Sequence, residues 1–209
     1  MLSIIQAAGW PIWPLIACSV LALALIIERF VSLKRAKVVP PKLLEEALAV
    51  SRTAVPTPDV VRQLEQNSAL GEVLASGFRA LNADPRCSES DLRAIMENSG
   101  RSVAHRLERY LSALATIASA APLLGLLGTV IGMIEIFGSQ SPTGGATGGN
   151  PAQLAHGISV ALYNTAFGLM VAIPSLIFWR YFRARVDEYL LTLELSAERL
   201  VRHLNSLRR

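Results

Sequence analysis

Three long apolar stretches alternate with charged segments along this chain. They cover roughly residues 10–27, 111–137 and 157–179, and none contains Lys or Arg. At ~1.5 Å of rise per residue, the shortest gives ~27 Å of helix, which crosses a hydrocarbon core of ~30 Å with local accommodation. The pattern therefore predicts three transmembrane helices. Trp10 and Trp13 open the first, where indole rings favour the membrane interface.

The segments outside these stretches also have helical patterns. Residues 42–51 and 59–81, set between prolines, predict helices, and Ser88 with Asp91 resembles a capping box at the start of another. Apolar positions then recur at steps of three and four as far as the second stretch without a breaker. They predict one helix of about fifty residues. Pro122 should kink it.

The third stretch should continue as a helix to the end of the chain. Asn150 and Pro151 supply an N-cap and a first-turn proline for it. Beyond the membrane its apolar positions follow a 3.5-residue repeat typical of a helix-packing seam: Val186, Leu190, Leu193, Ala197, Leu200, Leu204 and Leu207. This seam packs either against the chain's own cytoplasmic helix or against a neighbouring subunit.

Charge fixes the expected topology. All 20 Lys and Arg residues lie outside residues 1–28 and 110–179, and short basic loops stay in the cytoplasm. We expect the amino end outside and the carboxyl end inside. The chain divides into a first span with its outer end (1–28), a cytoplasmic helical region (29–110), a second span (111–137), an outer Gly-rich loop (138–150), a third span (151–179) and a cytoplasmic helix (180–209).

Composition agrees with a mixed membrane protein. The chain is 52% hydrophobic, with a mean hydropathy of +0.40, which is too polar for a protein made only of spans. Basic residues beside the spans favour contact with anionic lipid headgroups. Acidic residues interleave with them and no aromatic recognition motif accompanies them, so nucleic-acid binding is not expected. Cys18 and Cys87 fall on different sides of the predicted membrane boundary and should be free thiols.

The second and third spans hold the candidate chemistry. Small residues let membrane helices approach closely, and we assign this packing role to Gly125, Gly128, Gly132 and Gly168, with Pro122 and Pro174 inside the spans. Thr129 and Thr165 should lie at similar depth, with Asn164 beside the latter. A hydroxyl that bonds back to its own helix explains most membrane threonines, but two at one depth, next to an asparagine, favour a polar pathway.

Glu135 is the acidic residue of these two spans, and it lies near the outer end of its span. It has either an interfacial structural role or a place on an ion pathway. No Asp, Glu, Lys, Arg or His occupies the middle of any span. Either this protein moves no ions, or a partner supplies the acid. His105, His156 and His203 are scattered without a nucleophile, metal-ligand spacing or phosphate loop, so we expect no enzyme activity, metal or cofactor.

Two runs carry a family resemblance: A-P-L-L-G-L-L-G-T-V-I-G-M-I-E-I-F (121–137) and G-I-S-V-A-L-Y-N-T-A-F-G-L-M-V-A-I-P (157–174). They resemble the signature spans of the MotA/TolQ/ExbB proton-channel family, and the three-span layout resembles its ExbB/TolQ branch. The resemblance implies an all-α protein of the bacterial inner membrane that forms a homopentamer around an ExbD- or TolR-like single-span partner. That partner carries the essential Asp, and Thr129 and Thr165 match the pore-lining threonines.

The resemblance also implies a function. Proton flow would drive a TonB- or TolA-like protein that acts on the outer membrane, either in uptake or in envelope maintenance. One departure is that Val160 stands where many relatives have Glu, which puts any route through that acid in doubt. The competing hypotheses are a membrane scaffold that conducts nothing and a self-sufficient small-molecule transporter.

Overall fold

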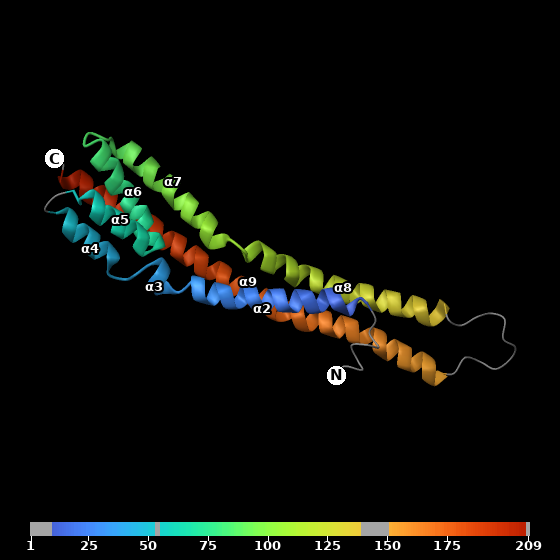
Figure 1. Ribbon diagram of the computed structural model, residues 1–209. Helices are drawn as coiled ribbons and strands as arrows, with labels where there is room; N and C mark the ends of the chain where they lie inside the picture. The colour runs from blue at the N-terminus through green and yellow to red at the C-terminus, as the bar shows by residue number, and fades with distance from the viewer. Residues whose placement is uncertain (1–9, 53–54, 139–150, 208–209) are drawn as a thin grey trace. The chain divides into compact units, whose positions relative to one another are not determined.

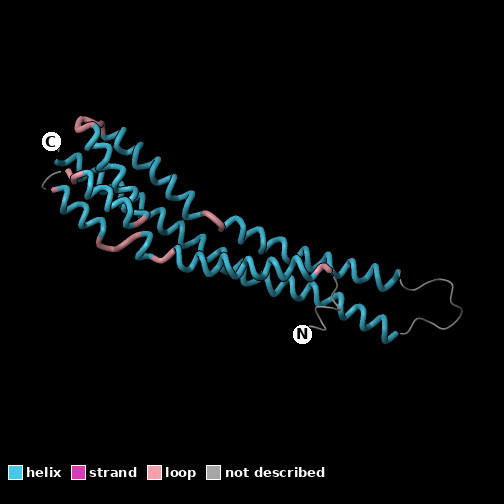
Figure 2. Tube along the Cα trace, in the orientation of Figure 1, coloured by secondary structure: helices cyan, strands magenta, loops and turns pink. Residues whose placement is uncertain are grey.

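The computed structural model describes residues 10–52, 55–138 and 151–207, and all regular structure in these residues is helical (Figures 1 and 2). The chain is therefore all-α, as predicted. The helices are α2 (Ile12–Ser32), α3 (Arg35–Val38), α4 (Leu43–Ser51), α5 (Pro58–Asn67), α6 (Ala69–Ala83), α7 (Glu89–Glu108), α8 (Leu111–Gly138) and α9 (Pro151–Leu207).

Contacts divide the chain into two units, and each is described by itself. Met1–Glu28 and Tyr110–Arg180 form the first, which we call the spanning unit, and Arg29–Arg109 and Tyr181–Arg209 form the second, which we call the charged unit. The names follow from composition, because Arg180 is the only one of the 20 basic residues that falls in the spanning unit.

The three expected spans are present as helices. α2, α8 and the first part of α9 belong to helices long and apolar enough to cross a membrane. In the spanning unit α2 meets α8 and α9 through a small apolar cluster. Its buried members are Leu15, Ala121, Val171 and Ala172, and its partly buried neighbours are Cys18, Ile117, Leu124 and Phe167. The first span begins at Ile12 and runs on to Ser32, so it is longer than the apolar stretch alone predicts.

The charged unit has a core of large side chains. Phe78, Leu70, Leu74, Met96 and Val103 from α6 and α7 are fully buried, or nearly so. The predicted seam of α9 is buried with them at Val186, Leu193, Leu200 and Leu204. Arg93 of α7 forms an ion pair with Glu198 of α9 at 3.0 Å. Of the two alternatives for the seam, packing within the chain's own charged unit is the one that the structure shows.

The predicted helix over residues 59–81 is two helices. Ser68 interrupts it and caps α6, because its Oγ accepts a hydrogen bond from the backbone N–H of Gly71 at 3.0 Å. A Cβ atom on Gly71 would lie only 2.0 Å from the carbonyl oxygen of Leu64 on α5. Sequence pattern alone treats Gly71 as a weak helix residue, whereas here its missing side chain lets α6 begin tightly against α5.

The predicted helix of about fifty residues is also two helices. The capping box at its start is confirmed in part, since the Oγ of Ser88 accepts from the N–H of Asp91 at 3.1 Å. The helix then stops at Glu108, and α8 begins at Leu111. Tyr110 lies in the left-handed region with φ of 67°. Nothing in the sequence marks this break, because neither Arg109 nor Tyr110 is a helix breaker.

Other predictions have mixed outcomes. α4 matches the predicted helix at residues 42–51 within one residue, and α9 begins at Pro151 and continues to Leu207 as one helix. Cys18 and Cys87 are free thiols. The Gly-rich loop beyond Gly138, including the N-cap Asn150, and the side chain of Val160 lie outside the described residues.

Candidate functional site

Glycines bring α8 and α9 into backbone contact in the spanning unit. A Cβ atom on Gly168 of α9 would lie 2.6 Å from the carbonyl oxygen of Ala121, and one on Gly125 of α8 would lie 2.8 Å from that of Asn164. Both distances are shorter than any Cβ–oxygen contact in a relaxed structure. The two helices therefore approach so closely that only glycine fits at these two positions.

Asn164 occupies the space that a third glycine leaves open. Its side chain is 2% exposed, and a Cβ atom on Gly128 would lie 2.8 Å from its Cβ, Cγ and Nδ2 atoms. Further out, Gly132 faces the methyl group of Ala161, at 3.1 Å from where its own Cβ would be. The polar amide of Asn164 is thus held against bare backbone of α8 rather than against lipid.

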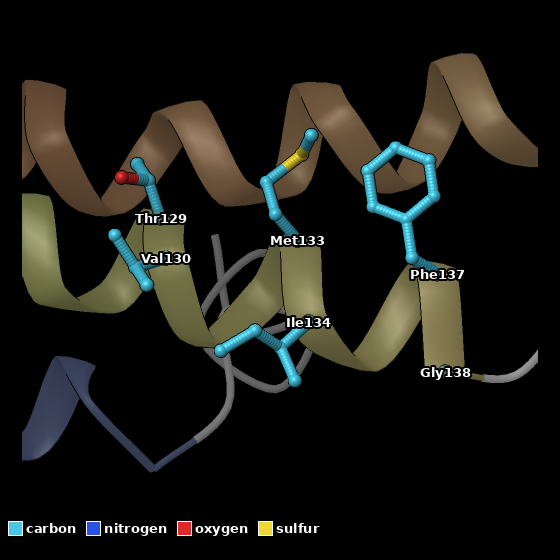
Figure 3. A pocket seen from close by; sticks show the side chains of 6 residues that line it. All are labelled: Thr129, Val130, Met133, Ile134, Phe137 and Gly138. Carbon is cyan, nitrogen blue, oxygen red and sulfur yellow. The ribbon is translucent and has the colours of Figure 1, made fainter.

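Thr129 follows Gly128 and lines a groove on α8. Its Oγ1 donates a hydrogen bond to the carbonyl oxygen of Leu126 at 2.6 Å, which is the back-bonded arrangement common for membrane threonines. Figure 3 shows Thr129, Met133 and Phe137 projecting from the same side of α8. The groove measures ≈570 Å³ and is lined by Thr129, Val130, Met133, Ile134, Phe137 and Gly138. Thr129 supplies its one polar side chain.

Thr165 is placed differently. Its Oγ1 is buried and has no hydrogen-bond partner among the described residues. A buried hydroxyl in that state costs about 1–3 kcal/mol, so Thr165 is a polar group suited to water or a partner chain. Because Gly128 packs on Asn164, the next residues along the two helices, Thr129 and Thr165, lie at a similar level. The structure does not join the two hydroxyls by a hydrogen bond.

Glu135 and the two prolines are not among the residues of the glycine contacts described above. Glu135 is exposed near the carboxyl-terminal end of α8. Pro122 and Pro174 lie inside α8 and α9, which continue through them. The arrangement of α8 and α9 therefore provides hydroxyl and amide groups between two closely packed apolar helices, and residues 111–134 and 157–179 contain no Asp, Glu, Lys, Arg or His. Such a site can hydrate a charge but cannot carry one.

Sequence reasoning missed two polar side chains that the structure buries. Ser175 is buried in α9 and donates to the carbonyl oxygen of Val171 at 2.7 Å. Arg29 is buried in the last turn of α2, although the charge pattern indicated only a residue that stops translocation. No sequence signal distinguishes Arg29 from its basic neighbours, because its burial depends on helices distant in sequence.

Known proteins match this chain over most of its length. The sequence profile of the MotA/TolQ/ExbB proton channel family matches residues 65–195. The putative biopolymer transport protein ExbB-like 3 of Synechocystis sp. is 33% identical over 86% of this chain and 83% of its own length. The biopolymer transport protein exbB1 of Vibrio cholerae is 35% identical over 81% of this chain and 73% of its own length. The Tol-Pal system protein TolQ of Pseudomonas aeruginosa is 30% identical over 83% of this chain and 77% of its own length.

The fold, the paired glycine-and-threonine spans and these relatives agree. The profile covers well over half of the chain, and the Synechocystis and Vibrio relatives exceed 30% identity over four-fifths of it. The chain is a membrane protein that belongs to the MotA/TolQ/ExbB proton channel family, within the ExbB/TolQ branch.

Proposed function

We propose that this protein is the channel-forming subunit of a motor in the bacterial inner membrane that is driven by the proton-motive force. An ExbD- or TolR-like single-span partner supplies the ionisable group, and a TonB- or TolA-like protein receives the work. The buried hydroxyl of Thr165 carries this proposal, because it is a polar group at the contact of two apolar helices and has no partner among the described residues.

Two further observations support the proposal. Residues 111–134 of α8 and 157–179 of α9 contain no Asp, Glu, Lys, Arg or His, so a conducting assembly needs a carboxylate or a base from another chain. Only 22–35% of the residues in the most apolar windows of the three spans are buried. The rest of this apolar surface requires lipid, further copies of the chain or a partner helix, which suits a ring of copies around a central helix. A pentamer is the stoichiometry that the family resemblance implies.

In this mechanism the chain's residues hydrate and position a proton without binding it covalently. The hydroxyls of Thr129 and Thr165, with the amide of Asn164, stabilise water beside the partner's carboxylate. Glu135, exposed at the outer end of α8, lies where protons would enter. Each proton crossing ~100 mV releases ~2.3 kcal/mol, so mechanical work on an outer-membrane protein requires several protons per event. The amino end faces the periplasm and the basic charged unit faces the cytoplasm and anionic lipid.

Proton flux in vesicles tests this function. The chain is reconstituted with its single-span partner, and Thr165→Val, which keeps size and removes the hydroxyl, is expected to lower the flux at least about tenfold. Thr129→Val should lower it as well. Thr116→Val is the matched control, because the Thr116 hydroxyl is exposed and bonds to the carbonyl oxygen of Ser112 on the same helix at 2.9 Å.

The alternatives predict other results. A scaffold that conducts nothing gives no flux with or without the partner, and Thr165→Val then changes nothing. A self-sufficient transporter gives full flux from the purified chain alone. Either result would contradict the proposal.

A further inference from the structure

Arg29 is a buried cation that the proposed channel does not use. It lies near the end of α2 and is 3% exposed. Its Nη1 donates a hydrogen bond to the backbone carbonyl oxygen of Leu107 at 3.0 Å. Burying a guanidinium is unfavourable unless strong hydrogen bonds replace its water, so within the charged unit this contact fixes the last turn of α2 against the end of α7.

The carbonyl that Arg29 binds belongs to the last turn of α7. The last four carbonyl groups of a helix lack donors within the helix, and they carry partial negative charge. Leu107 is among these, because α7 ends at Glu108. Arg183 adds a second cation there, with its Nη1 2.8 Å from the Oε1 of Glu108. Two arginines distant in sequence thus stabilise this carboxyl end of α7.

The chain leaves the helix directly after this end. Arg109 has φ −50° and ψ 138°, and Tyr110 has φ 67°. For a residue with a side chain, the left-handed region costs roughly 1–2 kcal/mol, and no Gly or Pro requires the interruption. If α7 and α8 joined into one helix, the backbone N–H of Leu111 would donate a hydrogen bond to the carbonyl oxygen of Leu107. The strain at Tyr110 would then disappear. The structure shows the interrupted backbone, and a joined backbone would be a second state free of this strain.

We infer that Arg29 selects between these two states: bound to the Leu107 carbonyl, it holds α7 and α8 as separate helices, and its release lets them join through Arg109 and Tyr110. Arg29 is a positioning residue in this account. The inference concerns the backbone at one point of the chain and does not depend on proton conduction.

Amide hydrogen exchange on the full chain in lipid nanodiscs tests this selection. In the interrupted state the amides of residues 111–113 have no acceptor within a helix, whereas in the joined state each has one. Arg29→Met, which keeps the apolar stem and removes the donors, should slow their exchange at least about tenfold, because a bond to a charged donor shifts an equilibrium by that factor or more. Arg29→Lys, with a single compact donor group, should slow exchange by a smaller factor.

Two further variants make the result decisive. Arg101→Met is the matched control, since Arg101 is exposed on α7 and pairs with Glu97 at 2.6 Å; it should leave these amides unchanged. Tyr110→Gly removes the strain of the left-handed backbone, so adding it to Arg29→Met should restore fast exchange.

Three outcomes would overturn the inference. The first is exchange that does not slow in either Arg29 variant. Unchanged exchange would mean that the bond from Arg29 to the Leu107 carbonyl does not affect the backbone state, and faster exchange would mean that it only stabilises the fold. The second is an equal slowing in Arg101→Met. The third is that every substitution at position 29 prevents the chain from folding, even when Tyr110→Gly is added. Arg29 would then be required for folding and would not select one backbone state.

Discussion

In the spanning unit α8 and α9 touch through backbone atoms at glycines, whereas in the charged unit α6 and α7 pack through side chains as large as Phe78 and Met96. All the ion pairs described above also lie in the charged unit, for example between Arg93 and Glu198. Water drives apolar side chains together in the charged unit. Lipid gives apolar side chains no such advantage, so close approach and polar contacts stabilise the spanning unit. One chain thus uses two kinds of packing, each suited to its solvent.

The largest expected effect is in the charged unit. Phe78 is 0% exposed, and Phe78→Ala should lower the free energy of unfolding by about 3–5 kcal/mol through lost burial and a cavity. Hydrogen exchange should accelerate in α6 and α7. The control Val50→Ala, at a side chain 49% exposed on α4, should have little effect. If exchange within the glycine contact of α8 and α9 accelerates equally, the two kinds of packing are not separable.

The next largest loss of stability is expected in the spanning unit, where the backbone of α8 leaves no room for a side chain on Gly168 of α9. Gly168→Ala places a methyl group 2.6 Å from the Ala121 carbonyl oxygen, and we expect a loss of about 1–3 kcal/mol because the helices must separate. Thermal unfolding in detergent measures it. Gly132→Ala is the matched control, because its methyl group lies 3.1 Å from the Ala161 methyl and no closer than 3.6 Å to any backbone atom of α9. Equal losses of stability in Gly168→Ala and Gly132→Ala would show that a collision with backbone costs no more than a collision with a side chain.

A double-mutant cycle sharpens this distinction. Gly128→Ala collides with the Cβ, Cγ and Nδ2 atoms of Asn164. Asn164→Ala removes the last two of these atoms, so it should recover at least about 0.5 kcal/mol of the loss. The same Asn164→Ala should give no recovery for Gly125→Ala, which collides with the Asn164 carbonyl oxygen and the Thr165 Cα. Thermal unfolding of the single and double variants gives both coupling energies. Recovery in both pairs would mean that the two helices reposition freely.

The smallest effect has the opposite sign. Gly100 lies in α7 of the charged unit, and a Cβ atom there meets nothing within 4 Å. Gly100→Ala should stabilise the protein by about 0.5–1 kcal/mol through helix propensity alone. The unfolding midpoint of this variant measures the gain. A loss would indicate that Gly100 makes a close contact in the assembled protein.

Sequence pattern was sufficient for features set by solvent and periodicity. The three apolar helices, the seam at Val186 and Leu193, and the cap at Ser88 follow from hydrophobic spacing and local hydrogen bonding. These signals are local, so a single chain carries them in full.

The pattern failed where distant contacts decide. The break at Tyr110 opposes local propensity, and the break at Ser68 depends on how closely α6 approaches Leu64. At the candidate site, the sequence indicated Thr129 and Thr165 but could not separate them. The structure shows Thr129 bonded back to its own helix and the Thr165 hydroxyl without a partner among the described residues. Side-chain hydrogen bonding of this kind depends on the rotation of one helix against another, which no one-dimensional pattern encodes.

The two thiols give this protein a practical property. Cys87 is buried in the charged unit, and Cys18 is half-buried beside the cluster that joins α2 to α8 and α9. Neither is well placed to react with an added reagent. An engineered cysteine at Ile134, on the groove of Figure 3 and 65% exposed in the single chain, would be more exposed than either native thiol. A single fluorophore or spin label can therefore be attached there while both native cysteines remain.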